Sequence, residues 1–354
     1  MKTEIIQVNP DFPDLDVMSR CGKIIRQGGL IVFPTETVYG IAADFNNPKA
    51  MQRLRGVKKR ADHKPFSILI SQKFLLSNYS PTTDPKIYKI IDQFWPGPLT
   101  VIVPSKEEEK SIGLRMPDHE IALKIVEESR CTIAAPSANF EGDVPPVTCQ
   151  QAMRKLDGLV DLAIDGGEAS VGQGSTIVNL TGDELSILRE GSISKGELEE
   201  TANTKTILFV CTGNSCRSVM AEYLLKDMVK NRGDLEIVSA GTSVFLQAQA
   251  SGDTISVLKE KGVDATRHYS QPLNPVLLKK SDLIFVMTRM HRQQILDRVP
   301  SVEKRVYLLR EFANIPANWT GDVDIPDPMG KNHAAYKDCV NVIQEALYKV
   351  VELI

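Results

Sequence analysis

A cysteine, a glycine and an arginine follow a strand-like run in the segment TILFVCTGNSCRSVMAEYLLKD, residues 206–227. Cys211 ends the apolar run, and a helix is expected to start a few residues later. A strand, a tight loop and a helix in this order direct backbone N–H groups and the helix N-terminus toward one point. The segment therefore predicts an anion site with a nucleophilic thiol at its base.

The loop offers further groups that such a site needs. Gly213 is expected to give backbone freedom where a side chain would crowd the amides, and Arg217 presents a planar fork suited to two phosphoryl oxygens. Lowering a thiol pKa from ~8.5 to about 5.5 takes roughly 4 kcal/mol, and a helix terminus supplies at best ~2 kcal/mol. Arg217, the loop amides and the Ser218 hydroxyl must therefore stabilise the Cys211 thiolate as well.

The alternative interpretation of Cys211 is a buried structural cysteine, but the strand, glycine, arginine and helix start in one segment favour the nucleophile. The chemistry also needs an acid for the leaving group. The Pro/Gly-rich segment GDVDIPDPMG supplies three candidates, Asp322, Asp324 and Asp327, for which a solvated turn is the alternative.

The motifs VCTGNSCRS, VSAGTSV, DLIFVMTRMH and DPMG together resemble the low-molecular-weight protein phosphatases over residues 205–354. The resemblance implies a small parallel sheet with helices on both faces and no cofactor. It implies that Cys211 attacks phosphorus, that Arg217 holds the phosphoryl oxygens, and that Asp327 protonates the leaving atom and then activates water. The supporting loop residues would be Thr212, Gly213, Asn214, Ser215, Cys216 and Ser218.

Two residues bear on the substrate, which is expected to be a phosphorylated protein. Ser215 stands where tyrosine-directed members of the family usually carry a larger aliphatic residue and where arginine-directed members carry threonine. Met329 stands where an aromatic ring is usual. These positions modestly favour phosphoarginine over phosphotyrosine. Arsenate reductases share the fold but need a further redox pair, which DLIFVMTRMH lacks, so that activity is disfavoured.

The composition fits two ordinary globular domains, since 354 residues exceed one typical core. A net charge of -3 gives no global attraction to nucleic acid or anionic lipid. The six cysteines show no C-x-x-C pair or zinc spacing, so no metal site is expected. Without a signal-like N-terminus or a spanning run, we expect a cytoplasmic protein with reduced thiols and no membrane partner.

Strand-like runs alternate with amphipathic stretches in both halves, which predicts α/β layers throughout. The expected strands are GGLIVFP, PFSILI, LTVIVP and STIVNL in the first half and TILFV and SDLIFVM in the second. The polar segment REGSISKGELEETANTKT between the halves is expected to carry a short helix. We predict domains over residues 1–194 and 205–354, joined by a linker at 195–204.

The first half has no P-loop motif but carries hydroxyl and basic residues at the ends of its strands. Lys58 and Arg60 are two apart and would face one side of an extended segment, which Pro65 favours nearby. Convergent basic and hydroxyl groups suit a polyphosphate and a carboxylate. Taken alone, each of these residues is more commonly part of a solvated face, a turn or an edge strand. The candidates are Thr35, Lys58, Arg60, Arg115, Ser137, Asn139, Ser175 and Arg189.

In this order the motifs PTETVYG, KPFSIL, APSAN, GSTIVNL and LREG resemble the threonylcarbamoyl-adenylate synthase (YrdC-like) family over residues 1 to about 194. The resemblance implies a twisted, mixed-sheet α/β domain. It implies the substrates ATP, bicarbonate and L-threonine, and threonylcarbamoyl-AMP as the product for modification of tRNA. Threonine would be held by Thr35, Arg115 and Ser175, and ATP with its Mg²⁺ by Lys58, Arg60, Ser137, Asn139 and Arg189. Expected further partners are tRNA or tRNA-modification proteins.

Two positions depart from that family pattern. Lys64 replaces a smaller polar residue before the proline, and Leu69 stands where some members have a threonine-contacting histidine. KPFS is also similar to a sister branch that could bind RNA. A non-catalytic RNA-binding module therefore stays the alternative for this half. The main prediction is a bifunctional fusion of a synthase-like and a phosphatase-like domain.

Overall fold

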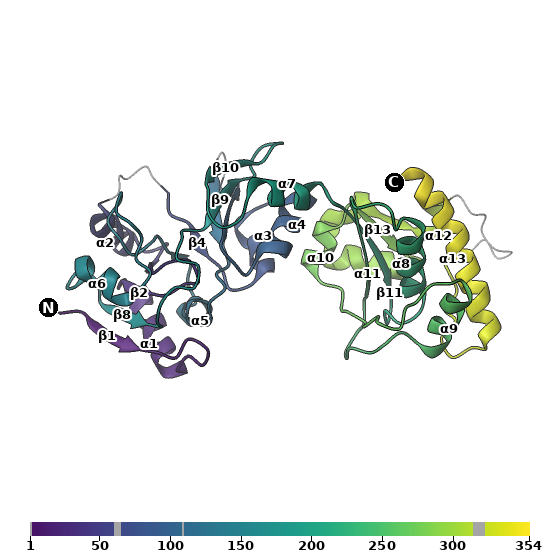
Figure 1. Ribbon diagram of the computed structural model, residues 1–354, viewed down its shortest axis with the longest axis horizontal. Helices are drawn as coiled ribbons and strands as arrows, with labels where there is room; N and C mark the ends of the chain where they lie inside the picture. The colour runs from purple at the N-terminus through teal and green to yellow at the C-terminus, as the bar shows by residue number, and fades with distance from the viewer. Residues whose placement is uncertain (1, 60–64, 108–109, 314–322) are drawn as a thin grey trace. The chain divides into compact units, whose positions relative to one another are not determined.

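The computed structural model describes residues 2–59, 65–107, 110–313 and 323–354. The chain divides into two compact units, one of residues 1–82 and 90–200, the other of residues 83–89 and 201–354 (Figure 1). The segment expected to carry a short helix forms α7 (Lys195–Asn203). The predicted domain limits themselves remain a prediction. In the described part of the chain, no helix combines the length and apolar character needed to cross a membrane.

The first unit is built on a mixed ten-stranded sheet in the order β1-β8-β2-β3-β7-β4-β6-β5-β9-β10. The pairs β1–β8, β8–β2, β4–β6 and β5–β9 are parallel, and the other neighbours are antiparallel. The strands are β1 (Glu4–Gln7), β2 (Ile31–Phe33), β3 (Gly40–Asp44), β4 (Ile68–Leu69), β5 (Leu99–Pro104), β6 (Ser111–Arg115), β7 (Ile133–Ala134), β8 (Leu162–Asp165), β9 (Thr176–Asn179) and β10 (Ser186–Arg189).

Helices cover both faces of this sheet because its central strands are apolar on both sides. On β2, Ile31 and Phe33 pack with α1 (Leu15–Arg26) and α5 (Glu120–Ser129), whereas Val32 packs with α2 (Pro48–Lys58) and α6 (Cys149–Leu156). The remaining helices of this region are the 3₁₀ turn η1 (Lys73–Leu75), α3 (Leu76–Tyr79) and α4 (Pro85–Phe94). The predicted mixed-sheet α/β fold is confirmed.

The second unit holds a four-stranded parallel sheet in the order β12-β11-β13-β14. The strands are β11 (Lys205–Cys211), β12 (Leu235–Gly241), β13 (Leu283–Val286) and β14 (Val306–Leu308). The helical segments are α8 (Arg217–Met228), α9 (Gly252–Glu260), α10 (Pro275–Lys280), α11 (Arg289–Arg298), η2 (Pro300–Arg305), α12 (Leu309–Phe312) and α13 (His333–Leu353).

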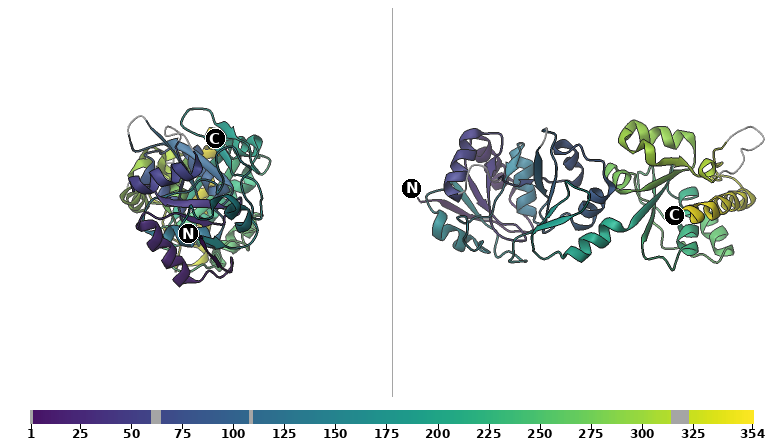
Figure 2. Two further views of the ribbon diagram at one scale, coloured as in Figure 1. Left: turned by 90° about the vertical axis from the view of Figure 1, so that its left-hand side faces the viewer. Right: turned by 90° about the horizontal axis from the view of Figure 1, so that it is seen from above.

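Alternate residues of β11 reach opposite helix layers. Phe209 and Cys211 pack with α8, α9 and α13, while Leu208 and Val210 pack with α10 and α11. Figure 2 shows these helix sets on opposite sides of the small sheet. The predicted doubly wound fold is confirmed, and the six expected strands all occur. Cys211 is the last residue of its strand and already lies against α8.

One local expectation is wrong. Lys58 does not lie on an extended segment but ends helix α2. Asn47 caps the N-terminus of that helix, Pro48 follows at its first turn, and Lys59 ends it in the left-handed conformation with φ 52°. Arg60 lies outside the described residues.

Gly22 marks a close crossing of α1 and α5. A Cβ built on Gly22 would lie 2.4 Å from the carbonyl oxygen of Glu128, a backbone atom that cannot move away by itself. We expect Gly22→Ala to lower the free energy of unfolding by about 1–3 kcal/mol, measured by urea denaturation of the full chain. Gly56→Ala is the matched control, since no atom lies within 4 Å of a Cβ there. Because Gly56 lies within helix α2, this substitution should raise the free energy of unfolding by about 0.5–1 kcal/mol. Equal behaviour of the two variants would contradict the close crossing.

Candidate functional site

The predicted strand, loop and helix in the second unit place a thiol beside a helix N-terminus. Cys211 ends β11, residues 212–216 form the loop, and Arg217 begins α8. The Cys211 Sγ lies 3.0 Å from the Ser218 Oγ, and both residues are buried. A hydroxyl at this distance can donate to a thiolate, and the first N–H groups of α8 have no partner within their helix.

Asn214 holds the turn of this loop. Its φ of 51° is in the left-handed region, which costs most residues energy but which asparagine tolerates. The buried side-chain amide donates to the Ser218 Oγ at 3.0 Å and to the Ser239 Oγ at 2.6 Å. Its Oδ1 accepts the Gln271 N–H at 2.9 Å. The loop conformation is thus tied to the hydroxyl that contacts the thiol.

A buried carboxylate stands behind Asn214. The Ser239 hydroxyl donates to Glu222 Oε2 at 2.5 Å, and His268 Nδ1 lies 3.8 Å from the same oxygen. His268 Nε2 lies 3.0 Å from the Asn214 carbonyl oxygen. Sequence reasoning did not single out Glu222, Ser239 or His268. Of these three, only Glu222 could have been noticed from the sequence, because it is a charged residue in the middle of the buried face of α8.

The expectation for Gly213 is wrong in its physical reason. A Cβ there would meet only the Ser215 Oγ, at 3.5 Å, which is an ordinary contact. The tight glycine is Gly241 at the end of β12, where a Cβ would lie 2.6 Å from the Thr212 carbonyl oxygen. The chain after Gly241 runs beside the loop, since Thr242 N donates to Cys211 O at 2.9 Å.

Arg217 lies against the segment that carries the predicted acid. Its Nη2 contacts Asp327 Oδ2 at 2.5 Å, and its Nη1 donates to Ile325 O at 3.2 Å. Its Nε is buried without a hydrogen-bond partner. Asp324 instead accepts the backbone N–H of Arg289 at 2.8 Å, and Asp322 lies outside the described residues. Of the two described carboxylates, Asp327 is thus the one in contact with the arginine.

Three buried cysteines share the core of this unit, and all are free thiols. Cys216 Sγ lies 3.4 Å from the Ser251 Oγ and 3.6 Å from the Ser215 Oγ. Cys339 packs in the same hydrophobic cluster as Cys211 and Cys216. Burial raises the pKa of the Cys339 thiol to about 12.

A second histidine contacts the loop from the side of α11. His291 Nε2 lies 2.9 Å from the Thr212 Oγ1, and its Nδ1 lies 2.8 Å from the Thr288 Oγ1. Burial, followed by the nearby positive charge of Arg217, lowers the pKa of His291 to about 4. The imidazole is therefore neutral near pH 7.

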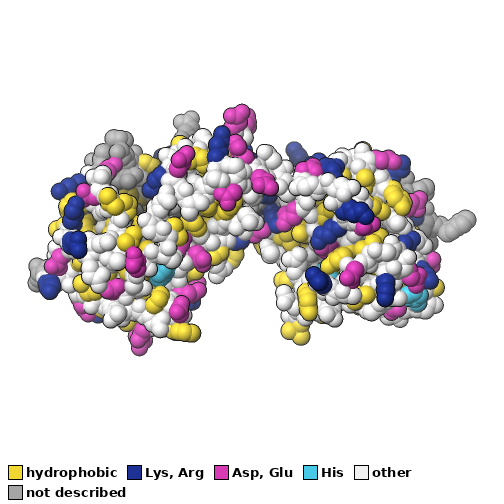
Figure 3. Space-filling view, viewed as in Figure 1, with side chains coloured by type: hydrophobic (Ala, Val, Ile, Leu, Met, Phe, Trp, Pro, Cys, Tyr) yellow, Lys and Arg dark blue, Asp and Glu magenta, His cyan; other side chains and the backbone are white. Residues whose placement is uncertain are grey.

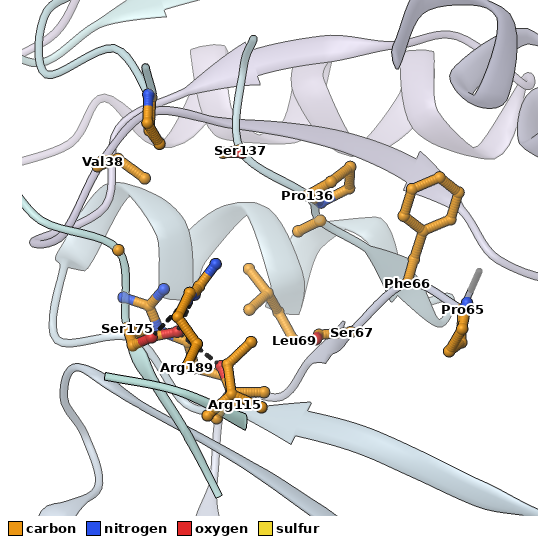
Figure 4. Close-up of a pocket in the computed structure, with 15 residues that line it drawn as sticks. Val38, Pro65, Phe66, Ser67, Leu69, Arg115, Pro136, Ser137, Ser175 and Arg189 are labelled. Carbon is orange, nitrogen blue, oxygen red and sulfur yellow. Dashed lines mark hydrogen bonds between the residues drawn. The ribbon is translucent and has the colours of Figure 1, made fainter. Parts of the chain in front are cut away.

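The first unit contains a cavity of about 200 Å³ with two arginines in its wall (Figure 4). Arg189 donates from Nε to Ser175 O at 2.9 Å and from Nη2 to the Ser175 Oγ at 3.0 Å. The same hydroxyl lies 2.8 Å from the Thr100 Oγ1. Arg115, Ser137 and Leu69 also line the cavity, so Leu69 presents an apolar wall.

Arg115 is held from behind by a buried carboxylate. Its Nη2 lies 2.9 Å from Glu36 Oε1 and donates to the Thr37 Oγ1 at 2.7 Å, while its Nε is buried without a partner. Burial, followed by the charge of Arg115, lowers the pKa of Arg189. Two guanidinium groups with one carboxylate leave a net positive cavity, which suits an anionic ligand. Sequence reasoning gave Glu36 no role.

Not all predicted ligands reach this cavity. Lys58 is buried, and its Nζ donates to Ser137 O at 2.6 Å and also to Asn139 O, so it holds the loop that carries both residues. The Thr35 Oγ1 donates to Val38 O at 2.7 Å, and Thr35 is not among the residues that line the cavity.

Two positions discussed for this half, Arg60 and Lys64, lie outside the described residues. Among the residues that are described, no group of three or more His, Cys, Asp or Glu side chains could hold a metal ion. The Mg²⁺ expected on the triphosphate stays a prediction. The binding roles predicted for both halves stay predictions.

Comparison with known proteins assigns each half to a family. The family model described as "Telomere recombination" (Sua5, YciO, YrdC) matches residues 23–191, and the model for "Low molecular weight phosphotyrosine protein phosphatase" matches residues 206–354. A putative threonylcarbamoyl-AMP synthase of Mycobacterium tuberculosis is 32% identical over 54% of this chain and 91% of its own length. The chain spans 55% and 60% of the length of the threonylcarbamoyl-AMP synthases from Bacillus subtilis and Pyrococcus abyssi, at 32% and 34% identity.

Solved structures match both halves. A Sua5 variant from P. abyssi is 25% identical, with a TM-score of 0.53 over 74% of this chain and 89% of that one. A YwlE arginine phosphatase from Geobacillus stearothermophilus is 32% identical over 42% of this chain and 92% of that one, with a TM-score of 0.38. The chain belongs to the Sua5/YciO/YrdC family in its N-terminal part and to the low-molecular-weight phosphatase family in its C-terminal part. Both resemblances drawn from the motifs are confirmed.

Asn214 allows a test of how the loop is held. Asn214→Ala adds left-handed strain of roughly 1–2 kcal/mol and removes buried hydrogen bonds of about 1 kcal/mol each. We expect a loss of about 4–5 kcal/mol in the free energy of unfolding, measured by urea denaturation. Asn214→Gly is the matched control, because it removes the same bonds without the strain and should lose about 1–2 kcal/mol less. Equal losses would show that the left-handed backbone contributes nothing.

Proposed function

We propose that this chain is bifunctional, a threonylcarbamoyl-AMP synthase joined to a cysteine-dependent phosphoprotein phosphatase. The observation that carries the phosphatase proposal is the loop geometry: a buried thiol 3.0 Å from a hydroxyl, at the N-terminus of α8. The arginine that opens this helix contacts a half-exposed carboxylate. A nucleophile, an anion cradle and an acid thus lie within one site.

The phosphatase reaction follows from these positions. The Cys211 thiolate attacks phosphorus as the bond to the leaving group breaks, and Asp327 gives its proton to that group. The loop amides and Arg217 hold the phosphoryl oxygens, and the unpartnered Arg217 Nε is available to one of them. Asp327 then takes a proton from water, which attacks the cysteinyl phosphate. The products are phosphate and the free thiolate, so the cycle closes without a cofactor.

A protein rather than a small phosphate ester is the substrate that the surroundings favour. Ser243 N donates to Thr212 O at 3.0 Å and Ser251 N to Ser215 O at 3.0 Å, so the chain between them is fixed to the loop at both ends. Phe245 and Leu246 stand on that connection, 94% and 84% exposed. Apolar side chains this exposed beside a catalytic loop suit the residues that flank a phosphorylated side chain.

The modest preference for phosphoarginine is carried by Ser215. Its side chain is small, and its hydroxyl, 3.6 Å from the Cys216 Sγ, can accept a hydrogen bond from a guanidinium group. A branched aliphatic side chain at this place would remove both the space and the acceptor.

Ser215→Ile tests this preference. We expect the ratio of kcat/KM for phosphoarginine to that for phosphotyrosine peptides to fall about tenfold or more, because a buried donor would lose its acceptor. Ser215→Thr keeps the hydroxyl and is the matched control. Faster phosphotyrosine than phosphoarginine turnover by the wild-type chain would refute the preference. No turnover of either peptide would refute the phosphatase itself.

The synthase proposal rests on the positive cavity of the first unit. Arg115 and Arg189 can hold the carboxylate of L-threonine and the phosphates of ATP, and Ser175 is hydrogen-bonded to Arg189 in the same cavity wall. Catalysis would consist mainly of positioning and charge stabilisation. RNA binding alone is less favoured, because acidic and basic side chains are interspersed over the surface seen in Figure 3.

The test is pyrophosphate release that requires ATP, L-threonine and bicarbonate together. Arg115→Lys should raise the KM for threonine by about tenfold or more, because lysine cannot replace a planar fork. Arg53→Lys is the control, since Arg53 pairs with Asp161 at the surface. Tight tRNA binding by the wild-type chain without any release of pyrophosphate would favour the RNA-binding alternative.

A further inference from the structure

His291 lies at the start of α11 but contacts the loop of the second unit. It is fully buried, and both ring nitrogens have partners within 2.9 Å, the Thr212 and Thr288 hydroxyls. Thr212 directly follows the candidate nucleophile Cys211. No catalytic step proposed above uses His291, so its two contacts need another explanation.

The cap of α11 favours one tautomer of the His291 ring. Thr288 caps α11, and its Oγ1 accepts the His291 backbone N–H at 3.3 Å. Its own proton can then be given to His291 Nδ1 at 2.8 Å. A neutral imidazole that accepts at Nδ1 carries its proton at Nε2. In that tautomer, Nε2–H donates to the Thr212 Oγ1.

The surrounding charges favour the same neutral state. Arg217 and Asp327 are the charged groups whose fields act on the ring, and Arg217 outweighs Asp327. A proton added to the ring would face this arginine and would also remove the acceptor for Thr288. The ring therefore keeps one donor and one acceptor in fixed positions near neutral pH.

The other side-chain contacts that hold the loop lie further along the chain, whereas at its start the backbone is also held, since Thr242 N donates to Cys211 O at 2.9 Å. His268 Nε2 and the side-chain bonds of Asn214 hold the middle of the loop. At Thr212, the backbone carbonyl accepts from Ser243 N at 3.0 Å, and the side chain has His291 as its hydrogen-bond partner in the described part of the chain. Rotation at Thr212 would turn the first loop amide away from the anion site.

We propose that His291 is a positioning residue of the phosphatase site: its Nε2–H holds Thr212 and thereby fixes the first amide of the loop toward the thiolate and the phosphoryl group. The proposal rests on the proposed phosphatase function and adds a residue to it. His291 touches neither substrate nor the reacting sulfur, so it acts only through Thr212. Its removal should weaken anion binding and thiolate stabilisation together.

The experiment compares His291→Gln and Thr212→Val with the wild-type full chain. One readout is the pH midpoint of Cys211 alkylation by iodoacetamide, followed by mass spectrometry at that residue. The other is the affinity for inorganic phosphate by calorimetry. We expect each variant to raise the midpoint by about one unit, a tenfold change, and to weaken phosphate binding about tenfold. The double variant should be no worse than either single one, because both remove the same contact.

The control is His333→Gln, at a half-exposed histidine at the start of α13 that pairs with Asp253 and Glu260. It should change neither readout. An unchanged midpoint and phosphate affinity in Thr212→Val, which is isosteric and expected to fold, overturns the proposal even if His291→Gln is unstable. Additive effects in the double variant overturn it as well. A wild-type Cys211 that alkylates like an ordinary thiol overturns the phosphatase proposal together with this one.

Discussion

The left-handed backbone at Asn214 is the constraint on which the second site depends. A chain that leaves β11 and enters α8 within five residues must turn sharply, and φ 51° at Asn214 makes that turn. The strain is held by buried bonds that reach Ser218, Ser239 and Gln271. Ser218 in turn contacts the thiol. Turn geometry and thiol environment are therefore one structure, and neither can change without the other.

The first unit meets a different constraint, which is repulsion between like charges. Arg115 and Arg189 share one cavity, and burial, followed by the charge of Arg115, lowers the pKa of Arg189. Glu36 offsets part of this charge from behind Arg115 but leaves the cavity wall cationic. An anion between the two guanidinium groups would relieve the repulsion that remains. A ligand of the kind proposed for this unit would thus stabilise the cavity.

Much of this could be predicted because the signals are local in sequence. The apolar runs predicted six of the strands. The segment around Cys211 predicted the strand, the loop and the helix of the second unit. Lys58 was assigned to the wrong local structure because Pro65 outweighed the capping signals of Asn47 and Pro48. Glu222, His268 and His291 were missed because their partners are distant: His268 meets Asn214 across 54 residues. The sequence also could not show that the closely packed glycine is Gly241 rather than Gly213, because Gly241 lies on a neighbouring strand.

The contact between Arg217 and Asp327 links recognition to acid chemistry. In the structure the two side chains bind each other. In the proposed reaction, the guanidinium would instead bind a phosphoryl oxygen, and the carboxylate would instead serve the leaving atom. Under the proposed phosphatase function, an incoming dianion would compete for the arginine and so release the carboxylate. A ligand without that charge would leave the pair closed. The ion pair would then act as a filter, in which the carboxylate becomes available to a leaving group only when a phosphoryl group has arrived.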